Sequence, residues 1–552
     1  MPTVEFLHSD LNSLLGKDLN AEELENAIHF VKGEVEDRNG DIVKVDMKDT
    51  NRPDLWSVEG IARELKGHLG LETGIPKYEV ESSGVKLIVD KKVEGVRPKT
   101  VAAVVKGLRF DDVSIKQIIQ LQEKITQTYG RNRSLVAIGV YDWNTLTPPI
   151  RYTTVKPDGI KFTPLDLDEE LTPGEILEKH PKGREFGHLI NKSPEYPLMI
   201  DSGNKVLSVP PIINSALTGK VSEVTTDVFI EITGHEVERI SVALNVIVAA
   251  FADRGGALGS VEVVYPDGNI VTPDFAPGDM KLNIEECNRI LGLELSSNEM
   301  VGLLGRARYD AKAGDGTITA EYPGYRRDIM HPRDVMEDIA IAYDVNKMKP
   351  APPQISTIGK VDEREEFAEL VRGLMMGLGF QEVLTFSLTN KDNLFSKMNI
   401  DERDVCEIAN PVSSNWTVLR NWLLPSMMDF FASNLHVEYP QKIYEVGDVV
   451  ALDNASETKT RNVKKLACAI TNSVVSYEDI ASVIDALLRN LGLEYRMVRA
   501  EHDSFIEGRA TEIIINDKKA GLMGEIHPKV LNEWGIEKPV VAFELALVAM
   551  RG

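Results

Sequence analysis

A proline-rich segment divides this chain and limits what it can fold into. Residues 347–356 read "KMKPAPPQIS", and proline can neither continue a helix nor donate a hydrogen bond within a central strand. We therefore interpret the segment as a linker between separately folded parts. The 552 residues are also too many for one hydrophobic core. At about 100–200 residues per domain, we expect an α+β multidomain protein of about three or four domains.

Apolar periodicity and turn signals divide the chain further. A turn-rich "LETGIPKYEV" closes a small α+β module, and "KTVAAVVKGLRF" begins a mixed α/β region with an apolar helix near His235. A second small module precedes the linker. Beyond it, long helices alternate with strands such as "QKIYEVGDVV", which indicates one larger α+β domain. The predicted domains are residues 1–82, 83–275, 276–350 and 358–552.

The two small modules share a sequence pattern. "LLGKDLNAEEL" at 14–24 and "ILGLELSSNEM" at 290–300 each place a helix end at glycine and then a capping pair. These pairs are Asn20 with Glu23 and Ser296 with Glu299, in which a side-chain oxygen caps the first amides and the Glu reaches back. Further on, "NRPDLWSVEGIAREL" and "HPRDVMEDIAIAYD" agree only in a turn followed by a helix. Duplication and the general likeness of helical hairpins both remain open.

Several classes of protein are disfavoured by composition. The longest apolar stretch, "ISVALNVIVAAFA" at 240–252, is shorter than the ~20 residues that cross a bilayer, so we expect no membrane span. We see no secretory signal in "MPTVEFLHSDLN". Cys287, Cys406 and Cys468 are isolated, which is typical of a reducing, cytoplasmic environment. A net charge of -24 disfavours broad, sequence-independent binding of nucleic acid by this chain alone.

Carboxylates concentrate in "YRRDIMHPRDVMEDIAIAYD" at 325–344. Asp334, Glu337 and Asp338 are spaced to share one helix face, and Asp328 ends the preceding strand. Four converging carboxylates would repel one another without a cation, and an all-oxygen set favours Mg²⁺ or Ca²⁺ over Zn²⁺. Alternatively, Asp334 and Glu337 cap the helix while the arginines of the segment neutralise the rest. The spacing alone leaves both interpretations open.

The chain resembles the β subunit of phenylalanyl-tRNA synthetase, of the shorter archaeal and eukaryotic type. The likeness rests on "DTNRPDLWSVEGIARELKGHLGL", on "YRRDIMHPRDVMED" and on the order of the motifs across all four regions. It implies winged-helix-like B1 and B5 modules at 1–82 and 276–350 and a B3/B4-type α/β editing domain at 83–275. It also implies a class II synthetase-like, catalytically silent α+β domain at 358–552.

The resemblance also implies a cofactor and partners. In that family a Mg²⁺ site shared with the α subunit follows a D-x5-D-x2-E-[ED] pattern, which here falls on Asp328, Asp334, Glu337 and Asp338. The implied assembly is an α2β2 heterotetramer that attaches L-phenylalanine to tRNA(Phe), with ATP and phenylalanine bound through α. We expect it in the cytoplasm.

The C-terminal domain lacks a residue that nucleotide activation requires. Catalytic class II synthetases carry an arginine on the second conserved strand, where its guanidinium matches phosphate oxygens. The stretch that resembles it here reads Tyr444-Glu445-Val446-Gly447. Glutamate cannot replace arginine on phosphate, so we expect the synthetic site in the α subunit. Arg420 is interpreted as an ion pair at a helix entry.

The resemblance places an editing pocket in residues 83–275. Ser208, Glu231 and Thr233 match hydrolytic-pocket residues and Met199 falls at a lining position, while Asn214 ends the neighbouring "VPPIIN". Glu231 and Thr233 are two apart on a strand and should share a face. An apolar phenylalanine site rejects tyrosine poorly, so a buried Glu231 that accepts the tyrosine hydroxyl would remove mischarged tyrosyl-tRNA(Phe). We expect hydrolysis by a positioned water.

Two other functions remain open. The chain could act as a free-standing aminoacyl-tRNA hydrolase, or as a non-enzymatic tRNA-binding scaffold built on the small modules. Turnover of tyrosylated tRNA by the chain without α would favour the hydrolase. No turnover in the chain or the complex would favour the scaffold.

Overall fold

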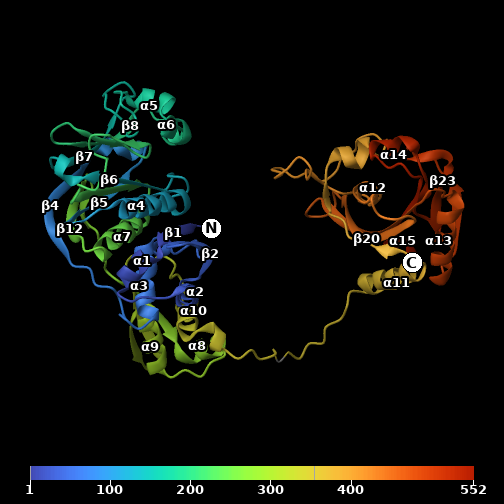
Figure 1. Cartoon of the computed structure of the whole chain (residues 1–552), viewed down its shortest axis with the longest axis horizontal. Coiled ribbons are helices and arrows are strands. Elements are labelled where there is room, and N and C mark those ends of the chain that lie inside the picture. The colour runs from blue at the N-terminus through green and yellow to red at the C-terminus, as the bar shows by residue number, and fades with distance from the viewer. Residues whose placement is uncertain (1, 354, 552) are drawn as a thin grey trace. The chain divides into compact units, whose positions relative to one another are not determined.

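The chain folds into two compact units. The computed structural model describes residues 2–353 and 355–551. The units are Met1–Pro352 and Pro353–Gly552, so the boundary falls within the proline-rich segment. Figure 1 colours the first unit from blue to yellow and the second from yellow through orange to red.

The first unit contains two small modules with the same order of elements, a strand, two helices, a hairpin and a third helix. The first module runs over β1 (Thr3–Leu7), α1 (His8–Leu15), α2 (Ala21–Ile28), β2 (Gly33–Asn39), β3 (Ile42–Met47) and α3 (Val58–His68). The second module runs over β14 (Gly278–Asn283), α8 (Ile284–Leu291), α9 (Ser297–Arg306), β15 (Asp310–Gly314), β16 (Thr317–Tyr322) and α10 (Pro332–Tyr343). Their three-stranded sheets have the matching orders β1-β3-β2 and β14-β16-β15.

The local structure of the modules agrees in detail. Both predicted capping boxes form, at Asn20 and at Ser296. Gly16 and Gly292 end α1 and α8 with φ of 69° and 67°, a left-handed conformation that glycine adopts without strain. An asparagine in each module makes a pair of hydrogen bonds with a leucine backbone, Asn12 with Leu19 and Asn288 with Leu295.

The likeness continues through the third helix of each module, contrary to our expectation. The guanidinium of Arg52 lies 2.8 Å from Asp54 and 3.1 Å from Glu64. In the second module Arg326 pairs with Asp328 and lies 2.7 Å from Asp338. The spacing is identical, with partners two and twelve residues after each arginine. The two stretches thus agree in more than a turn followed by a helix, since Arg52-Pro53-Asp54 corresponds to Arg326-Arg327-Asp328.

The two arginine–carboxylate triads meet where the modules pack together. The Nε of Arg52 lies 4.0 Å from Oδ1 of Asp328, and both arginines are buried. Burial alone would lower the pKa of Arg326, but Asp338 and Asp328 raise it well above its ordinary value. Burial would likewise raise the pKa of Asp328, but Arg326 and Arg52 hold it below the ordinary range. The two arginines therefore hold the modules together through one connected set of buried ion pairs, in which Asp328 faces both guanidinium groups.

Between the modules in sequence lies a large mixed sheet. Its order is β10-β9-β8-β7-β4-β12-β5-β11-β6, with β13 paired to β12. The strands are β4 (Val80–Val89), β5 (Lys99–Lys106), β6 (Val136–Asp142), β7 (Ile150–Val155), β8 (Tyr196–Asp201), β9 (Val206–Val209), β10 (Ile213–Asn214), β11 (Val228–Gly234), β12 (Ala257–Tyr265) and β13 (Gly268–Thr272). The domain boundary predicted at residue 82 falls inside β4.

Two helices cover one face of this sheet. These are α4 (Asp112–Lys124) and α7 (Val237–Asp253), whose apolar side chains share a core with alternate residues of β5, β6 and β11 (Figure 1). The alternate residues of the same strands, including Ala102, Tyr141 and Phe229, belong to a second core on the other face. The short helices α5 (Pro173–Lys179) and α6 (Pro181–Phe186) lie close to each other beyond β7 in sequence.

The second unit is a sheet covered by helices on both faces. Its order is β17-β20-β21-β25-β24-β23-β22, all antiparallel except β17 with β20. The strands are β17 (Gln381–Glu382), β20 (Gln441–Leu452), β21 (Thr460–Thr471), β22 (Tyr495–Arg499), β23 (Phe505–Ile515), β24 (Lys518–Ile526) and β25 (Val540–Ala546), with a separate pair β18 (Leu388–Thr389) and β19 (Val418–Leu419). One face packs on α11 (Glu363–Gly377), α13 (Tyr477–Asn490) and α15 (Leu547–Met550), the other on α12 (Leu424–Ser433) and α14 (Pro528–Glu533).

The triads lead to a stability prediction. Arg326→Ala should destabilise the first unit by about 3–5 kcal/mol, because it leaves two buried carboxylates without their cation. The neighbouring Arg327→Ala is the control, since Arg327 pairs with Glu238 while both side chains are more than half exposed, and it should change stability by less than about 0.5 kcal/mol. Urea unfolding of the full chain measures both.

The effect should depend on pH in a defined direction. The depressed pKa of Asp328 means that its ion pair stabilises fully above the ordinary value of 3.8 and is lost as the pH falls through the lower folded value. The difference in the free energy of unfolding between the native chain and Arg326→Ala should therefore become smaller below about pH 4. Equal losses of stability from Arg326→Ala and Arg327→Ala at pH 7 would contradict a network of buried ion pairs.

Candidate functional site

Glu231 lies on β11, between β5 and the last strand β6 of the large sheet, on the face opposite α7. It belongs to β11 and pairs with Ala102 of β5 on one side and Gly139 of β6 on the other. Only 2% of Glu231 is exposed. Because both flanking residues are small, the carboxylate stands in a space that larger neighbours would fill.

A tyrosine reaches across this space. The hydroxyl of Tyr141 lies 2.9 Å from Oε1 of Glu231, 2.8 Å from the hydroxyl of Ser208 and 3.4 Å from Oδ1 of Asn214. A Cβ on Gly139 would come within 2.2 Å of that hydroxyl, so the phenol crosses directly over the glycine. Ser208 is on β9 and Tyr141 on β6, which are far apart in the strand order. The sheet therefore curves until strands from opposite parts of it meet at this cluster.

The charge state of Glu231 is finely balanced. Burial raises its pKa to about 7, against the lowering effects of the Tyr141 hydrogen bond and of the charge on Arg97. Burial also raises the pKa of Tyr141 well above its ordinary value, so its phenol stays a neutral donor. The second carboxylate oxygen, Oε2, is buried and has no hydrogen-bond partner among the residues that the structure describes. A buried acceptor without a partner is costly and favours a polar group that can enter and bind it.

Most residues predicted for the editing pocket gather here. Ser208, Asn214 and Glu231 meet at the Tyr141 hydroxyl, and Met199 is the strand partner of Ser208 on β8. Thr233 shares the sheet face of Glu231 as expected, but its hydroxyl accepts a hydrogen bond of 2.9 Å from Nε of Arg97.

Sequence reasoning missed Tyr141 and Arg97. In "VAIGVYD" Tyr141 stands two residues after Gly139, so alternation alone places both on one face. The pattern could not indicate that β6 lies beside β11, or that β9 curves round to meet it.

The acidic segment does not form the cluster we expected. Asp328 and Asp338 pair with Arg326, and Asp338 also accepts a hydrogen bond of 2.5 Å from Tyr309. Asp334 accepts from the backbone amides of Met330 and His331 at 2.8 and 2.7 Å. Glu337, which is exposed, lies 2.8 Å from the ammonium of Lys32.

The prediction that these four carboxylates converge on one point was therefore wrong. Among the described residues, no group of three or more His, Cys, Asp or Glu side chains is arranged to hold a metal ion. Asp328 also follows β16 in an irregular segment rather than ending a strand. Carboxylate oxygens are suitable ligands for a hard cation, but the four carboxylates are not arranged around one point where such an ion could bind.

Comparison of the two modules separates the four carboxylates into pairs. At the positions that correspond to Asp328 and Asp338 the first module has Asp54 and Glu64, which serve the same arginine contact. At the positions that correspond to Asp334 and Glu337 it has Gly60 and Arg63. The first pair thus has a packing role common to both modules, whereas the second pair is particular to the second module.

In the second unit Glu445 is fully buried and paired. Its carboxylate lies 2.7 Å from the guanidinium of Arg420, which also contacts Thr385 and the backbone of Asp448. Arg420 precedes α12, so its interpretation as an ion pair near a helix entry is confirmed.

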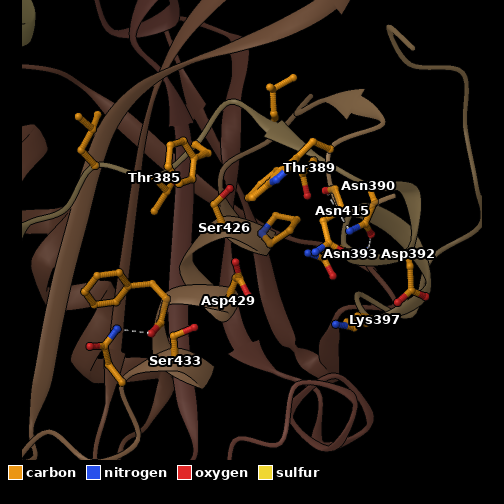
Figure 2. A pocket seen from close by; sticks show the side chains of 17 residues that line it. Thr385, Thr389, Asn390, Asp392, Asn393, Lys397, Asn415, Ser426, Asp429 and Ser433 are labelled. Atoms are coloured by element: carbon orange, nitrogen blue, oxygen red, sulfur yellow. Dashed lines mark hydrogen bonds between the residues drawn. The ribbon is translucent and has the colours of Figure 1, made fainter. Parts of the chain in front are cut away.

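A cavity of about 530 Å³ opens beside this ion pair. Figure 2 shows Ser426, Asp429 and Ser433 of α12 lining one side, while Asn390 and Asn415 gather at another. An apolar patch adjoins it, made of Leu384, Phe386, Leu388 and Trp416. Leu384 is 89% and Phe386 77% exposed, which is unusual for large apolar side chains.

Among the residues that the structure describes, no helix combines the length and apolar composition needed to cross a bilayer.

Comparison with known proteins identifies the family. Residues 349–547 match the model of the phenylalanyl tRNA synthetase beta chain CLM domain, and residues 280–345 match that of the tRNA synthetase B5 domain. Over 551 residues the chain is 48% identical to the phenylalanine–tRNA ligase beta subunit of Pyrococcus horikoshii, covering 99% of each chain. It is 40% identical to that of Methanocaldococcus jannaschii, covering 99% of this chain and 100% of the relative.

A solved structure agrees with this assignment. The crystal structure of an N-terminal fragment of the P. horikoshii phenylalanyl-tRNA synthetase beta subunit matches with a TM-score of 0.61 and 48% identity. The match covers 62% of this chain and 99% of the fragment. On these grounds the chain belongs to the phenylalanine–tRNA ligase beta subunits.

Proposed function

We propose that this chain serves phenylalanine–tRNA ligase in two ways, as the subunit that edits mischarged tRNA and as a non-catalytic partner of the α subunit. The family assignment makes it part of a ligase that acts together with an alpha subunit. The observation that carries the editing role is the buried Glu231, whose Oε2 has no partner within the cluster of Tyr141 and Ser208.

Selectivity follows from that unpartnered oxygen. A site for phenylalanine rejects tyrosine weakly, because an apolar pocket tolerates an added hydroxyl. A second site that needs the hydroxyl can separate the two. The phenol of a tyrosyl group would donate to Oε2 of Glu231, whereas a phenylalanyl group would leave that oxygen buried and unsatisfied. Met199 and Thr233 are proposed to line the same pocket, and hydrolysis is assigned to a water positioned beside the ester.

Glu231→Gln tests the editing role. It should slow hydrolysis of tyrosyl-tRNA(Phe) by the complex with α about ten- to a hundredfold, because losing a charged acceptor costs about 1.5–3 kcal/mol. It should also reduce the preference for tyrosyl- over phenylalanyl-tRNA(Phe). Glu238→Gln is the control, since Glu238 is an exposed surface acid, and both variants are compared by deacylation of labelled aminoacyl-tRNA.

The same assay decides between the remaining functions. Full activity of Glu231→Gln would contradict the assigned pocket. Turnover by this chain without α favours a free-standing hydrolase, and no turnover by chain or complex favours a tRNA-binding scaffold.

The second unit is proposed to be a silent class II core. A buried Glu445 held by Arg420 stands on the strand where catalytic members carry the phosphate-binding arginine. ATP and phenylalanine are therefore assigned to the α subunit, within an α2β2 heterotetramer. Because this chain has a net charge of -24, α is also expected to supply much of the cationic surface that tRNA(Phe) needs.

The apolar patch is proposed as a docking surface for α. Leu384, Phe386, Leu388 and Trp416 line one cavity, and the rings of Phe386 and Trp416 stack edge to face at 5.4 Å. Large exposed aromatic side chains grouped in this way are typical of the buried centre of protein interfaces.

Phe386→Asp should weaken binding of α at least about tenfold, since a charge in the buried centre of an interface costs more than about 1.4 kcal/mol. Val474→Asp is the control, because Val474 is an apolar residue as exposed as Phe386, at 82%, but does not line this cavity. Analytical ultracentrifugation of the mixed subunits gives both affinities. Equal affinities for the two variants would move the interface elsewhere.

Mg²⁺ binding at Asp328, Asp334, Glu337 and Asp338 remains a proposal, and the geometry narrows it. Two of these carboxylates, Asp328 and Asp338, are already paired with Arg326. Mg²⁺ is usually held by one or two carboxylates and keeps several waters. Asp334 and Glu337 are therefore the candidates to contribute to a site that the α subunit completes.

Magnesium titration calorimetry should show no saturable site in this chain alone and one in the complex with α. Glu337→Gln should weaken that site about tenfold or more, because one of few ligands is lost. Glu285→Gln, an acid at the start of α8, should leave it unchanged. A complex without any magnesium-dependent heat at this segment would contradict the proposal.

A further inference from the structure

The hydrogen bonds of Tyr141 form a directed chain. A phenol has one proton to donate, and its hydroxyl lies within hydrogen-bond distance of both Glu231 and Ser208. The carboxylate can only accept when ionised, so Tyr141 donates to Oε1 of Glu231 and accepts from the hydroxyl of Ser208. This arrangement engages one carboxylate oxygen and leaves Oε2 as the buried, unpartnered acceptor.

The sheet is shaped to admit this phenol. Gly139 stands opposite Glu231, and a Cβ there would come within 2.2 Å of the Tyr141 hydroxyl and 2.8 Å of Oε1 of Glu231. Any other residue at position 139 would thus displace the phenol from the carboxylate. Tyr141 is itself fully buried and packs against Phe229, so its ring has little freedom to move.

We propose that Tyr141 is a positioning residue of the editing site, which holds Glu231 ionised and turned so that its second oxygen receives the phenolic hydroxyl of the tyrosyl substrate. This inference rests on the proposed editing function. It assigns tyrosine selectivity to a pair, in which one resident phenol satisfies one oxygen and the substrate phenol satisfies the other.

Every charged or titratable group that acts on Glu231 fits this role. Burial raises the pKa of Glu231 to about 7, although Tyr141 on β6, Arg97 just before β5 and Ser208 on β9 each lower it. The charge of Glu231 also raises the pKa of Tyr152 on β7, but the Tyr152 hydroxyl donates to the backbone oxygen of Arg97. The guanidinium of Arg97 donates its hydrogen bonds to Thr233 and Ser134. Tyr141 is therefore the phenol that bonds Glu231 directly.

Tyr141→Phe tests the proposal, because it removes the hydroxyl and keeps the ring. Deacylation of tyrosyl-tRNA(Phe) by the complex with α is followed from pH 6 to 8.5. Ionised Glu231 is the acceptor, so activity should rise with pH through the pKa of Glu231. Loss of the Tyr141 hydrogen bond raises that pKa, so the midpoint should move to higher pH and activity at pH 7 should fall about tenfold.

Two comparisons keep the test specific. Tyr265→Phe removes another buried phenol of the same sheet, one that bonds to Thr100 rather than to Glu231, and its midpoint should match that of the native chain. Gly139→Ala should reproduce the shift by displacing Tyr141. In all variants hydrolysis of phenylalanyl-tRNA(Phe) serves as the substrate comparison.

The outcomes separate the two proposals. If Glu231→Gln impairs editing while Tyr141→Phe keeps the native midpoint and rate, the pocket stands and the role of Tyr141 is overturned. If Glu231→Gln edits normally, the proposed function itself fails. A rate loss in Tyr141→Phe without a change in midpoint, shared by Tyr265→Phe, would assign Tyr141 a structural role only.

Discussion

The contact between two buried arginine triads organises the first unit. Arg52 and Arg326 each hold an acid two residues and another twelve residues further on, and the triads meet through Arg52 and Asp328. Buried ions are tolerated only when they are paired and hydrogen-bonded. Each triad satisfies this requirement within its own module, and their contact fixes how modules that are distant in sequence pack together. The duplicated contact also explains why Asp328 and Asp338 face an arginine rather than a metal ion.

Pairing separates the structural acids of this protein from the functional candidate. Glu64, Asp328 and Glu445 are each bound by an arginine, and the pKa values of Glu64 and Asp328 lie below their ordinary ranges. Glu231 is equally buried, but the group bonded to it is the neutral phenol of Tyr141. The nearby Arg97 is bonded to Thr233 instead. Burial raises the pKa of Glu231 to about 7, because no arginine bonds to it, and a proton or a donor hydroxyl can bind there at physiological pH.

The same reasoning connects the second unit with the rest of the assembly. Arg420 and Glu445 neutralise each other inside the sheet domain, so neither is free to bind phosphate. What this unit does present is an apolar surface beside a polar cavity, with Phe386 and Leu384 largely exposed. The internal ion pair supports the proposal that this unit is a silent core beside a catalytic neighbour. Membership of a family of ligase beta subunits implies such a neighbour, an alpha subunit.

Features set by neighbours along the chain were determined by the sequence. The capping boxes at Asn20 and Ser296 formed as predicted, because they need only residues three apart. Alternation placed Glu231 and Thr233 on one face for the same reason. Tertiary structure alone decided which partner each buried group meets. The spacing of Asp328 and Asp338 would also suit a metal ion, but in the folded chain both carboxylates pair with Arg326. Tyr141 reaches Ser208 only because the sheet curves. Charge and hydrogen-bond partners come from the packing of distant strands and helices, and their positions are not contained in local spacing.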